Sequence, residues 1–375
     1  MIIVHIVEPF AAGIAVFVKS LTEAMPADMH IVIHGERKKE MLASEVKKSF
    51  PRNNVRFIRW RSAQRNIDLF KDVLAFTELY KILNRLKKKN LVDAVHLHSS
   101  KSGLLGRAAC RMAGISNVFY TPNGASFLSG GSGLKRYIYR QLERVGNRFG
   151  GSVVCCSESE LEEYLKLGIN ADYINNGVSF KPQSNTEVED RSEKFRIVTS
   201  GRVEKQKNPH LFNEIAAYFE EMSQFEFIWI GDGKDKQEFT SKNVKVTGWL
   251  GNKEVQQYVA NSNLYISTSN YEGLSFAVLE ALALKKPVLL SNCTGNTDLV
   301  KNGVNGGLFN TSYEAIVKIL QYHNNREMLE VMGSYSGEIC RAEFDMKQNF
   351  KSYRDLYAGA IRPAGNGPVK WSLGY

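Results

Sequence analysis

The stretch LYISTSNYEGLSFAVLEA, residues 264–281, predicts both a parallel-sheet fold and a ligand site. Its first five residues, 264–268, are mostly apolar and predict a buried strand. Gly273 and Ser275 then allow a tight turn and a helix cap. A helix that begins near Ser275 points its free backbone amides at the end of the strand, where they can bind a phosphate group.

Two acids accompany this helix start. Glu280 falls one turn inside the helix, where a carboxylate can accept hydrogen bonds from sugar hydroxyls, as an acid does for ribose in dinucleotide sites. Glu272 lies on the preceding loop, nearer to a reacting sugar. Each acid alone is equally well explained by ordinary compensation of the helix dipole, so the prediction rests on the pair in this context.

A second loop, residues 200–209, follows the predicted strand Phe195–Ser200 and carries Arg202 and Lys207. Arginine can bind a diphosphate through two hydrogen bonds, and lysine adds a compact positive charge. Together they can neutralise a leaving diphosphate without a metal ion. The alternative is a solvated loop with no ligand.

Two glycine-containing turns are weaker candidates. Gly231 and Gly233 follow the predicted strand Phe225–Ile230 and permit close approach of the backbone to a ligand, although a plain turn is equally consistent. Gly13 ends an Ala-Ala-Gly bridge between the first strand and the first helix. This bridge lacks the Gly-x-Gly-x-x-Gly spacing of a dinucleotide site.

Metal and cofactor sites are not predicted. His96 and His98 share one face of a strand, but a metal site needs three or four converging ligands. His98, at the strand end, is instead a candidate for contact with an acceptor. The chain also lacks the Asp-x-Asp pair with which the commonest metal-dependent sugar transferases hold a cation, so we expect no metal and no cofactor.

Strands alternate with helical patterns in two series, which predicts two doubly wound α/β domains with parallel sheets. The first series begins at Ile2–Val7 and the second at Phe195–Ser200. The polar segment Lys181–Glu193 between them is predicted to be a linker. Ligands of such sheets bind beyond the carboxyl ends of the strands, so two facing sheets would hold a ligand in the cleft between them.

Composition supports this organisation. The chain has 375 residues, of which 43% are hydrophobic and 23% charged, so it suits two globular domains. Its five cysteines are odd in number and form no Cys-x-x-Cys, which disfavours a disulfide framework or a zinc site and fits a reducing cytosol. The first residues predict a strand rather than a signal peptide, and no run of about 18 apolar residues predicts a membrane span.

The net charge of +10 is confined to the first half of the chain. Residues 1–180 carry 26 basic and 16 acidic side chains, whereas residues 181–375 carry 23 of each. Residues 36–65 combine ten basic side chains with Phe50, Phe57 and Trp60, and residues 81–89 add five more positive charges. Such segments suit an anionic lipid surface, nucleic acid or a solvated helix face.

Taken together, these segments resemble the retaining glycosyltransferase family 4, whose members have the GT-B fold. The resemblance covers nearly the whole chain, and the order and spacing of the segments carry it. They include Glu272 with Glu280, residues 201–202 with 207–209, residues 230–233, Gly248, Ser157, residues 176–178 and residues 302–306.

The resemblance implies two facing Rossmann-like domains with a cleft between them. Residues 1–185 would bind the acceptor, residues 186–344 would bind the nucleotide sugar, and the chain from about 345 to 375 would return to the first domain. It also implies roles for the site residues. Arg202 and Lys207 would bind the diphosphate, Glu280 the ribose, and Gly13 would lie beneath the donor. Glu272 would hold the transferred sugar together with the backbone amides of Gly273, Leu274, Ser275 and Phe276.

One residue departs from the family pattern. The family has histidine in a Pro-His-Gly turn near the transferred sugar, and this chain has Asn123 there, within residues 121–124. Asparagine donates and accepts hydrogen bonds but takes up no proton. We therefore hypothesise an unusual donor sugar, altered at its sixth carbon.

The expected function is retaining, metal-independent transfer of a sugar from a nucleotide diphosphate, with UDP favoured over GDP. The expected acceptor is a lipid-linked saccharide at the inner face of the cytoplasmic membrane, in assembly of a bacterial capsule or O-antigen. Peripheral contact of the basic N-terminal domain with anionic membrane fits this acceptor. Two alternatives stay open: a nucleotide-sugar epimerase or hydrolase of the same fold, and a nucleic-acid-binding protein, which the pair Glu272 and Glu280 argues against.

Overall fold

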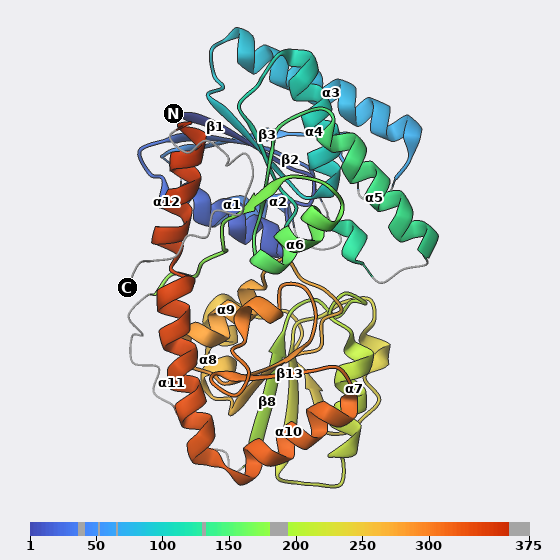
Figure 1. Ribbon diagram of the computed structural model, residues 1–375, viewed down its shortest axis with the longest axis vertical. Helices are drawn as coiled ribbons and strands as arrows, with labels where there is room; N and C mark the ends of the chain where they lie inside the picture. Colours follow the sequence, from blue (N-terminus) through green and yellow to red (C-terminus); the bar gives the residue numbers. More distant parts are fainter. Residues whose placement is uncertain (37–41, 52, 65–66, 130–132, 181–193, 360–375) are drawn as a thin grey trace. The chain divides into compact units, whose positions relative to one another are not determined.

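The computed structural model describes residues 1–36, 42–51, 53–64, 67–129, 133–180 and 194–359. The chain forms two compact units (Figure 1). Unit 1 contains Met1–Asn176 and the chain from Met346, and unit 2 contains Gly177–Asp345. The first crossing between units therefore lies before the expected boundary at 185–186. The predicted linker 181–193 lies outside the described residues.

Unit 1 is built on a seven-stranded parallel sheet of order β3-β2-β1-β4-β5-β6-β7. Its strands are Ile2–Val7 (β1), Met29–His34 (β2), Val55–Arg59 (β3), Ala94–His98 (β4), Val118–Thr121 (β5), Ser152–Cys155 (β6) and Ala171–Tyr173 (β7). Helices cover both faces of a parallel sheet, so its central strands are buried on both sides and are almost continuously apolar. This explains why β1 and β4 were recognisable from sequence.

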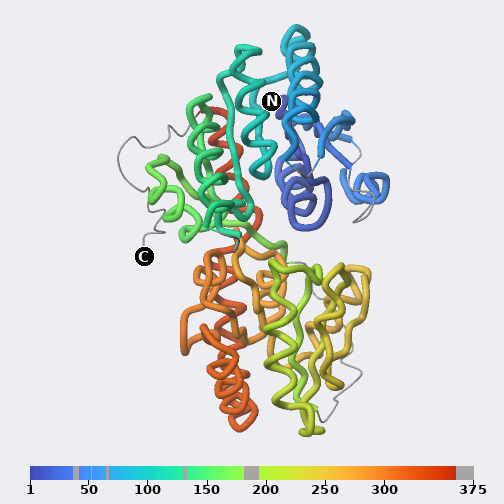
Figure 2. Tube along the Cα trace, turned by 90° about the vertical axis from the view of Figure 1, so that its right-hand side faces the viewer, coloured from blue at the N-terminus to red at the C-terminus, as the bar shows by residue number. Residues whose placement is uncertain are grey.

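The helices of unit 1 form two layers. The helices α3 (Leu69–Lys88), α4 (Ser100–Ala113) and α5 (Gly133–Asn147) lie side by side on one face, where α6 (Glu158–Lys166) joins the same core (Figures 1 and 2). On the other face, α1 (Ala12–Ala24) packs against α12 (Met346–Tyr357). Unit 1 also contains the short helix α2 (Ala43–Lys48) and the 3₁₀ turn η1 (Ser126–Leu128).

Helix α12 is anchored to unit 1 although it comes from the end of the chain. The ring of Phe350 meets that of Phe17 on α1 at a centroid distance of 5.4 Å. Arg354 Nε donates to Asp28 Oδ2 at 2.9 Å, and Asn117 donates to the carbonyl of Tyr357. The part of the chain expected to return, from about 345, thus does so through α12, and residues 360–375 lie outside the described residues.

Unit 2 is built on a six-stranded parallel sheet of order β10-β9-β8-β11-β12-β13. Its strands are Phe195–Ser200 (β8), Phe225–Ile230 (β9), Val244–Val246 (β10), Leu264–Ser267 (β11), Val288–Ser291 (β12) and Gly306–Phe309 (β13). Its helices are Pro209–Tyr218 (α7), Asn252–Ala260 (α8), Phe276–Ala283 (α9), Ser312–Asn324 (α10) and Arg326–Glu343 (α11). The strand order reverses between β8 and β11, so the topological switch point lies between these two strands.

Both units are therefore doubly wound α/β sheets, as predicted. None of the helices in the described part of the chain has the length and apolar composition that a membrane span requires.

The basic segment 36–65 differs from its expected form. Phe50 and Trp60 are buried, and Trp60 Nε1 donates to the carbonyl of Ala75 in the core. Trp60 thus packs against α3, and Phe50 packs against the rings of Phe10 and Phe57, so neither aromatic side chain is available to a lipid surface. Residues 37–41, 52 and 65 of this segment lie outside the described residues.

Candidate functional site

The loops that follow β8 and β11 meet at the switch point of unit 2. The backbone amide of Asn270 donates to the carbonyl of Gln206 at 2.8 Å, and Thr268 Oγ1 donates to the carbonyl of Lys207 at 2.8 Å. These bonds fasten the loop with the predicted cations to the loop with the predicted acid. The carboxyl edge of the sheet at this point is where doubly wound folds bind ligands.

Lys207 and Glu272 form an ion pair at this point, with Nζ 2.7 Å from Oε1. Ser269 Oγ donates to the same oxygen at 2.6 Å. Burial disfavours the charge of Lys207, but the Glu272 carboxylate outweighs it and raises the lysine pKa. Lys207 therefore stays cationic beside a buried carboxylate.

Arg202 supplies a second cation from the same loop. Its Nη1 lies 3.7 Å from Glu204 Oε2, and its side chain is partly exposed. Its positive charge opposes the rise in the Lys207 pKa, but less than burial does, and the Glu272 carboxylate outweighs both. A diphosphate carries the charge that such a pair can neutralise.

Close packing explains why the turn after β9 contains two glycines. A Cβ on Gly231 would lie 2.1 Å from the carbonyl oxygen of Gly201, and one on Gly233 would lie 2.3 Å from that of Val203. The sequence predicted close approach to a ligand, whereas the close approach in the structure is to the loop that carries Arg202. Because glycine has no Cβ, that loop can pack directly against the turn after β9.

Helix α9 begins at Phe276, and its N-cap Ser275 makes no side-chain hydrogen bond to the helix amides. Gly273, Leu274 and Ser275 are buried in the turn before it. The first amides of the helix therefore lack a side-chain cap and are suited to an anion.

Glu280 lies one turn into α9, and burial raises its pKa to about 7. A carboxyl group with this pKa is divided between its neutral and ionised forms near neutral pH. Hydrogen bonds from ligand hydroxyls would favour the ionised form.

Three residues of this site were missed by the sequence analysis: Ser269, Gln206 and Gly295. Gln206 Nε2 donates to the carbonyl of Tyr271 at 3.2 Å and so steadies the Glu272 loop. Gly295 has φ +82°, and a Cβ there would lie 2.6 Å from the carbonyl oxygen of Gly273. The position of Gly295 in the turn that follows the strand Val288–Ser291 was an available signal, because that strand ends at the same edge.

In unit 1, Gly13 and Asn123 lie beyond the carboxyl ends of β1 and β5. Gly13 is exposed, and Ala12 before it has φ +50°, a conformation that costs a non-glycine residue about 1–2 kcal/mol. Glycine, which the family usually has at this position, would adopt this conformation without that cost. Asn123 has φ +55° and donates to the carbonyl of Thr121, and asparagine is among the residues that best tolerate this conformation.

His98, the candidate for acceptor contact, is fully buried. Its Nε2 lies 3.1 Å from His5 Nδ1, and His5 Nε2 lies 3.0 Å from His30 Nδ1. Ligand atoms of His5, His96 and His98 fall within 4.8 Å of one another, a spacing that could hold a metal ion. The contacts equally fit a chain of neutral imidazoles, and burial lowers the pKa of all three well below its ordinary value. His98 therefore faces the core rather than a substrate.

Comparison with known proteins agrees with this geometry. The family model for a glycosyl transferase 4-like domain matches residues 12–177, and the model for glycosyl transferases group 1 matches residues 169–338. An Escherichia coli UDP-Gal:alpha-D-GlcNAc-diphosphoundecaprenol alpha-1,3-galactosyltransferase is 30% identical over 325 residues, which cover 79% of this chain and 82% of that protein.

Two further proteins are similar. An uncharacterised 41.2 kDa protein of the cps region of Klebsiella pneumoniae is 27% identical over 86% of this chain and 90% of its own length. Among solved structures, Anabaena HepE in complex with UDP and glucose has a TM-score of 0.76 at 18% identity, covering 96% of this chain and 99% of HepE.

Proposed function

The chain belongs to the glycosyl transferases group 1, and from this premise we propose that it transfers a sugar from a UDP-sugar to a lipid-linked saccharide, with retention of the anomeric configuration and without a metal ion. The observation that carries the proposal is the Lys207–Glu272 pair at the switch point of unit 2, with Arg202 on the same loop as Lys207.

The donor diphosphate would bind Arg202, Lys207 and the first amides of α9. Positive groups aimed at a leaving group act most strongly when they are already in place, because no reorganisation is then needed as charge develops. Glu272 and Ser269 keep Lys207 in such a fixed position. Glu280 would accept hydrogen bonds from the ribose hydroxyls.

Transfer with retention follows if the acceptor attacks from the face that the diphosphate leaves. The bond between the anomeric carbon and the diphosphate oxygen breaks, and a bond from that carbon to the acceptor oxygen forms. The departing phosphate oxygen takes the acceptor hydroxyl proton, so no protein base is needed. His98 is buried, so this mechanism does not assign it the role of a base.

The acceptor and the pathway are proposed from the relatives. The galactosyltransferase relative acts on a sugar linked to diphosphoundecaprenol, and the Klebsiella relative comes from a cps region. We accordingly place the reaction at the inner face of the cytoplasmic membrane, in assembly of a surface polysaccharide.

The test uses purified protein, UDP-galactose or UDP-glucose, and a saccharide on a diphosphate lipid. We expect a disaccharide product with an α linkage by NMR. Release of free UDP at the full rate without an acceptor would contradict transfer and favour an epimerase or hydrolase.

A further inference from the structure

Helix α5 turns an apolar stripe towards solvent. Leu134, Tyr137 and Ile138 are spaced as neighbours on one helix face, and 70%, 60% and 44% of their surfaces are exposed. The opposite face carries Glu143 and Gly146, which are buried. Tyr139 on the buried side packs against the core, as in an ordinary surface helix. The stripe of Leu134, Tyr137 and Ile138 is a second apolar surface of α5, and it stays exposed.

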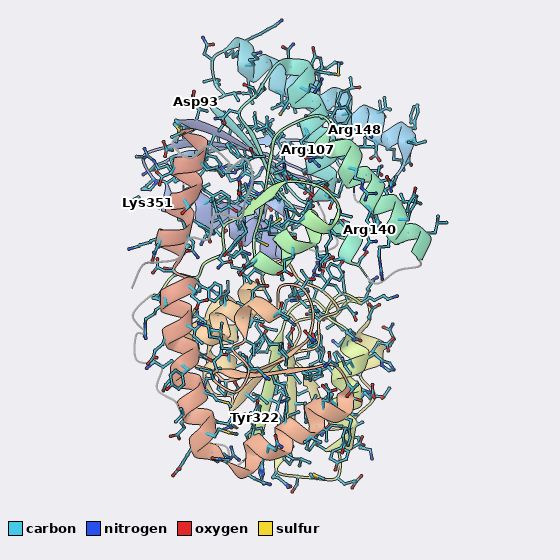
Figure 3. The ribbon with its side chains drawn as sticks, in the orientation of Figure 1. Asp93, Arg107, Arg140, Arg148, Tyr322 and Lys351 are labelled. Carbon is cyan, nitrogen blue, oxygen red and sulfur yellow. The ribbon has the colours of Figure 1, made fainter. Side chains whose placement is uncertain are left out.

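The same helix is strongly basic. Its charged residues are Lys135, Arg136, Arg140, Arg144 and a single acid, Glu143. That acid is buried and lies 3.3 Å from Arg107 Nη2 in the core. Figure 3 labels Arg140 and Arg148, which come from α5 and from the turn after it. Along α5, solvent therefore meets apolar side chains bordered by positive charge.

Helix α3 repeats the apolar part of this pattern. Leu69, Phe70 and Val73 in its first turns are exposed, Leu69 by 84% and Phe70 by 77%, whereas its opposite face is buried through Leu79 and Leu83. Lys101 at the start of α4 lies 2.6 Å from Asp72 in α3.

The starts of α3 and α5 lie at one edge of unit 1. The helices α3, α4 and α5 lie side by side, and each follows a strand of the same parallel sheet, so all three begin at its carboxyl edge. Neighbouring helix axes are about 8–10 Å apart. The first turns of α3 and α5, which we call the apolar edge, are therefore roughly 20 Å apart on this scale.

We propose that the apolar edge docks unit 1 on an anionic lipid bilayer. Apolar side chains bordered by Lys and Arg are the composition with which helices lie in a membrane interface, where the apolar groups enter the boundary and the cations meet acidic headgroups. The basic segments predicted from sequence are a different surface: residues 36–65 precede α3, and residues 81–89 lie at the opposite end of α3 from Leu69 and Phe70.

This inference deepens the proposed function and rests on it for the acceptor. Gly13 and Asn123 lie at the same carboxyl edge of the same sheet as the apolar edge. A lipid-linked saccharide whose tail stays in the bilayer would thus present its sugar close to the acceptor side of unit 1.

The test is flotation of the full chain with vesicles of phosphatidylglycerol and phosphatidylcholine at about 0.15 M salt, where distant surface charges are screened. The apolar variant is Leu134→Ser/Tyr137→Ser/Ile138→Ser. Its matched control is Tyr313→Ser/Val331→Ser/Tyr335→Ser, three exposed apolar residues of unit 2. We expect at least about tenfold weaker binding for the apolar variant and unchanged binding for the control.

Charge is tested separately with Lys135→Glu/Arg136→Glu against Lys81→Glu/Lys88→Glu, which changes the surface predicted from sequence. Each cation near anionic lipid contributes about fivefold to binding. We expect the first pair to lose at least about tenfold and the second pair to lose less. Equal losses for both pairs, or vesicle binding by the apolar variant equal to that of its control, would overturn the proposal.

Two further results separate the possible explanations. If the wild type ignores vesicles and the apolar variant converts a dimer to a monomer, the apolar edge is an interface between copies of this chain and the lipid proposal fails. Stabilisation by UDP, measured on every variant, reports on unit 2. If UDP does not stabilise the wild type, the proposed function is contradicted, but the vesicle measurement can still be interpreted.

Discussion

Lys207 Nζ lies 2.7 Å from Glu272 Oε1, although the two residues come from loops on different strands. The pair joins the leaving-group cation to the acid expected at the transferred sugar. A ligand that binds one of them therefore affects the other, and removal of either leaves a charge in a partly buried site without its partner.

Lys207→Ala should lower kcat by roughly 10²–10³, by analogy with the loss of one preorganised donor to a developing charge. The control is Lys205→Ala, which removes an exposed lysine from the same loop. Steady-state kinetics with a saturating UDP-sugar measures both. Near-normal turnover by Lys207→Ala would refute its role at the leaving group.

Glu280 should make UDP binding depend on pH. Its pKa of about 7 means that the carboxyl group is half protonated at neutral pH, and hydrogen bonds from ribose hydroxyls need the ionised form. The dissociation constant for UDP should therefore rise about tenfold per pH unit below 7 and level off above 8. Calorimetry from pH 5.5 to 8.5 measures this.

Glu280→Gln is the matched variant. Its UDP binding should be weaker and should keep only the pH dependence of the terminal phosphate of UDP, whose second pKa is about 6. The native carboxyl group has a pKa above that of the unfolded chain, so its ionisation costs stability as pH rises. The variant should consequently melt at a higher temperature than the wild type at pH 8. A variant whose UDP affinity changes with pH as steeply as that of the wild type would show that Glu280 does not control binding.

The histidine chain should make unit 1 sensitive to acid. Burial lowers the pKa of His5, His96 and His98. Below pH 6.5, therefore, these histidines bind protons in the unfolded chain but stay neutral in the native state. Their contribution is complete above pH 6.5 and falls by up to about 1.4 kcal/mol per pH unit for each histidine as pH decreases.

The buried Glu143 and Glu160 and the partly buried Glu280 have raised pKa values and act in the opposite sense, so the difference between variants is the useful quantity. The free energy of unfolding of His98→Gln, measured by denaturant between pH 7.5 and 5.5, should fall less steeply than that of the wild type. His210→Gln, an exposed control, should not change the slope. Parallel slopes for all three proteins would contradict the account of the cluster.

Asn123 should influence the donor sugar. Because asparagine cannot carry a positive charge, we expect the enzyme to prefer a donor that lacks the 6-hydroxyl over its matched hexose. Competition between UDP-galactose and UDP-6-deoxygalactose measures this preference. Asn123→His should fold, because histidine also tolerates positive φ, and should shift the preference towards the hexose. A clear preference of the wild type for the hexose would remove the hypothesis.

The sequence predicted much of the fold because the buried strands are short apolar runs, each followed by glycine or polar residues. The residues 264–281 are an example: β11, the turn and α9 all appear where they were expected. Such elements depend on residues that are close together in the sequence, so a short stretch of sequence is enough to predict them.

Relations across the sheet were not predictable in the same way. The contact of Lys207 with Glu272 depends on β8 and β11 being neighbours, which the order of the strands along the chain does not state. The role of Gly231 likewise depends on the backbone of Gly201 from another strand. The burial of His98 and Trp60 required knowledge of which helix covers each strand face.

The most direct test of the metal-free UDP-sugar site is the melting temperature of the purified protein with UDP, GDP and ADP, each with and without EDTA. A ligand that binds only the folded state stabilises it by mass action, by about 2.7 kcal/mol at a hundredfold excess over its dissociation constant. The account predicts a selective increase with UDP that EDTA leaves unchanged and that Lys207→Ala reduces. No increase with any diphosphate, or an increase that EDTA abolishes, would contradict the role of Arg202 and Lys207.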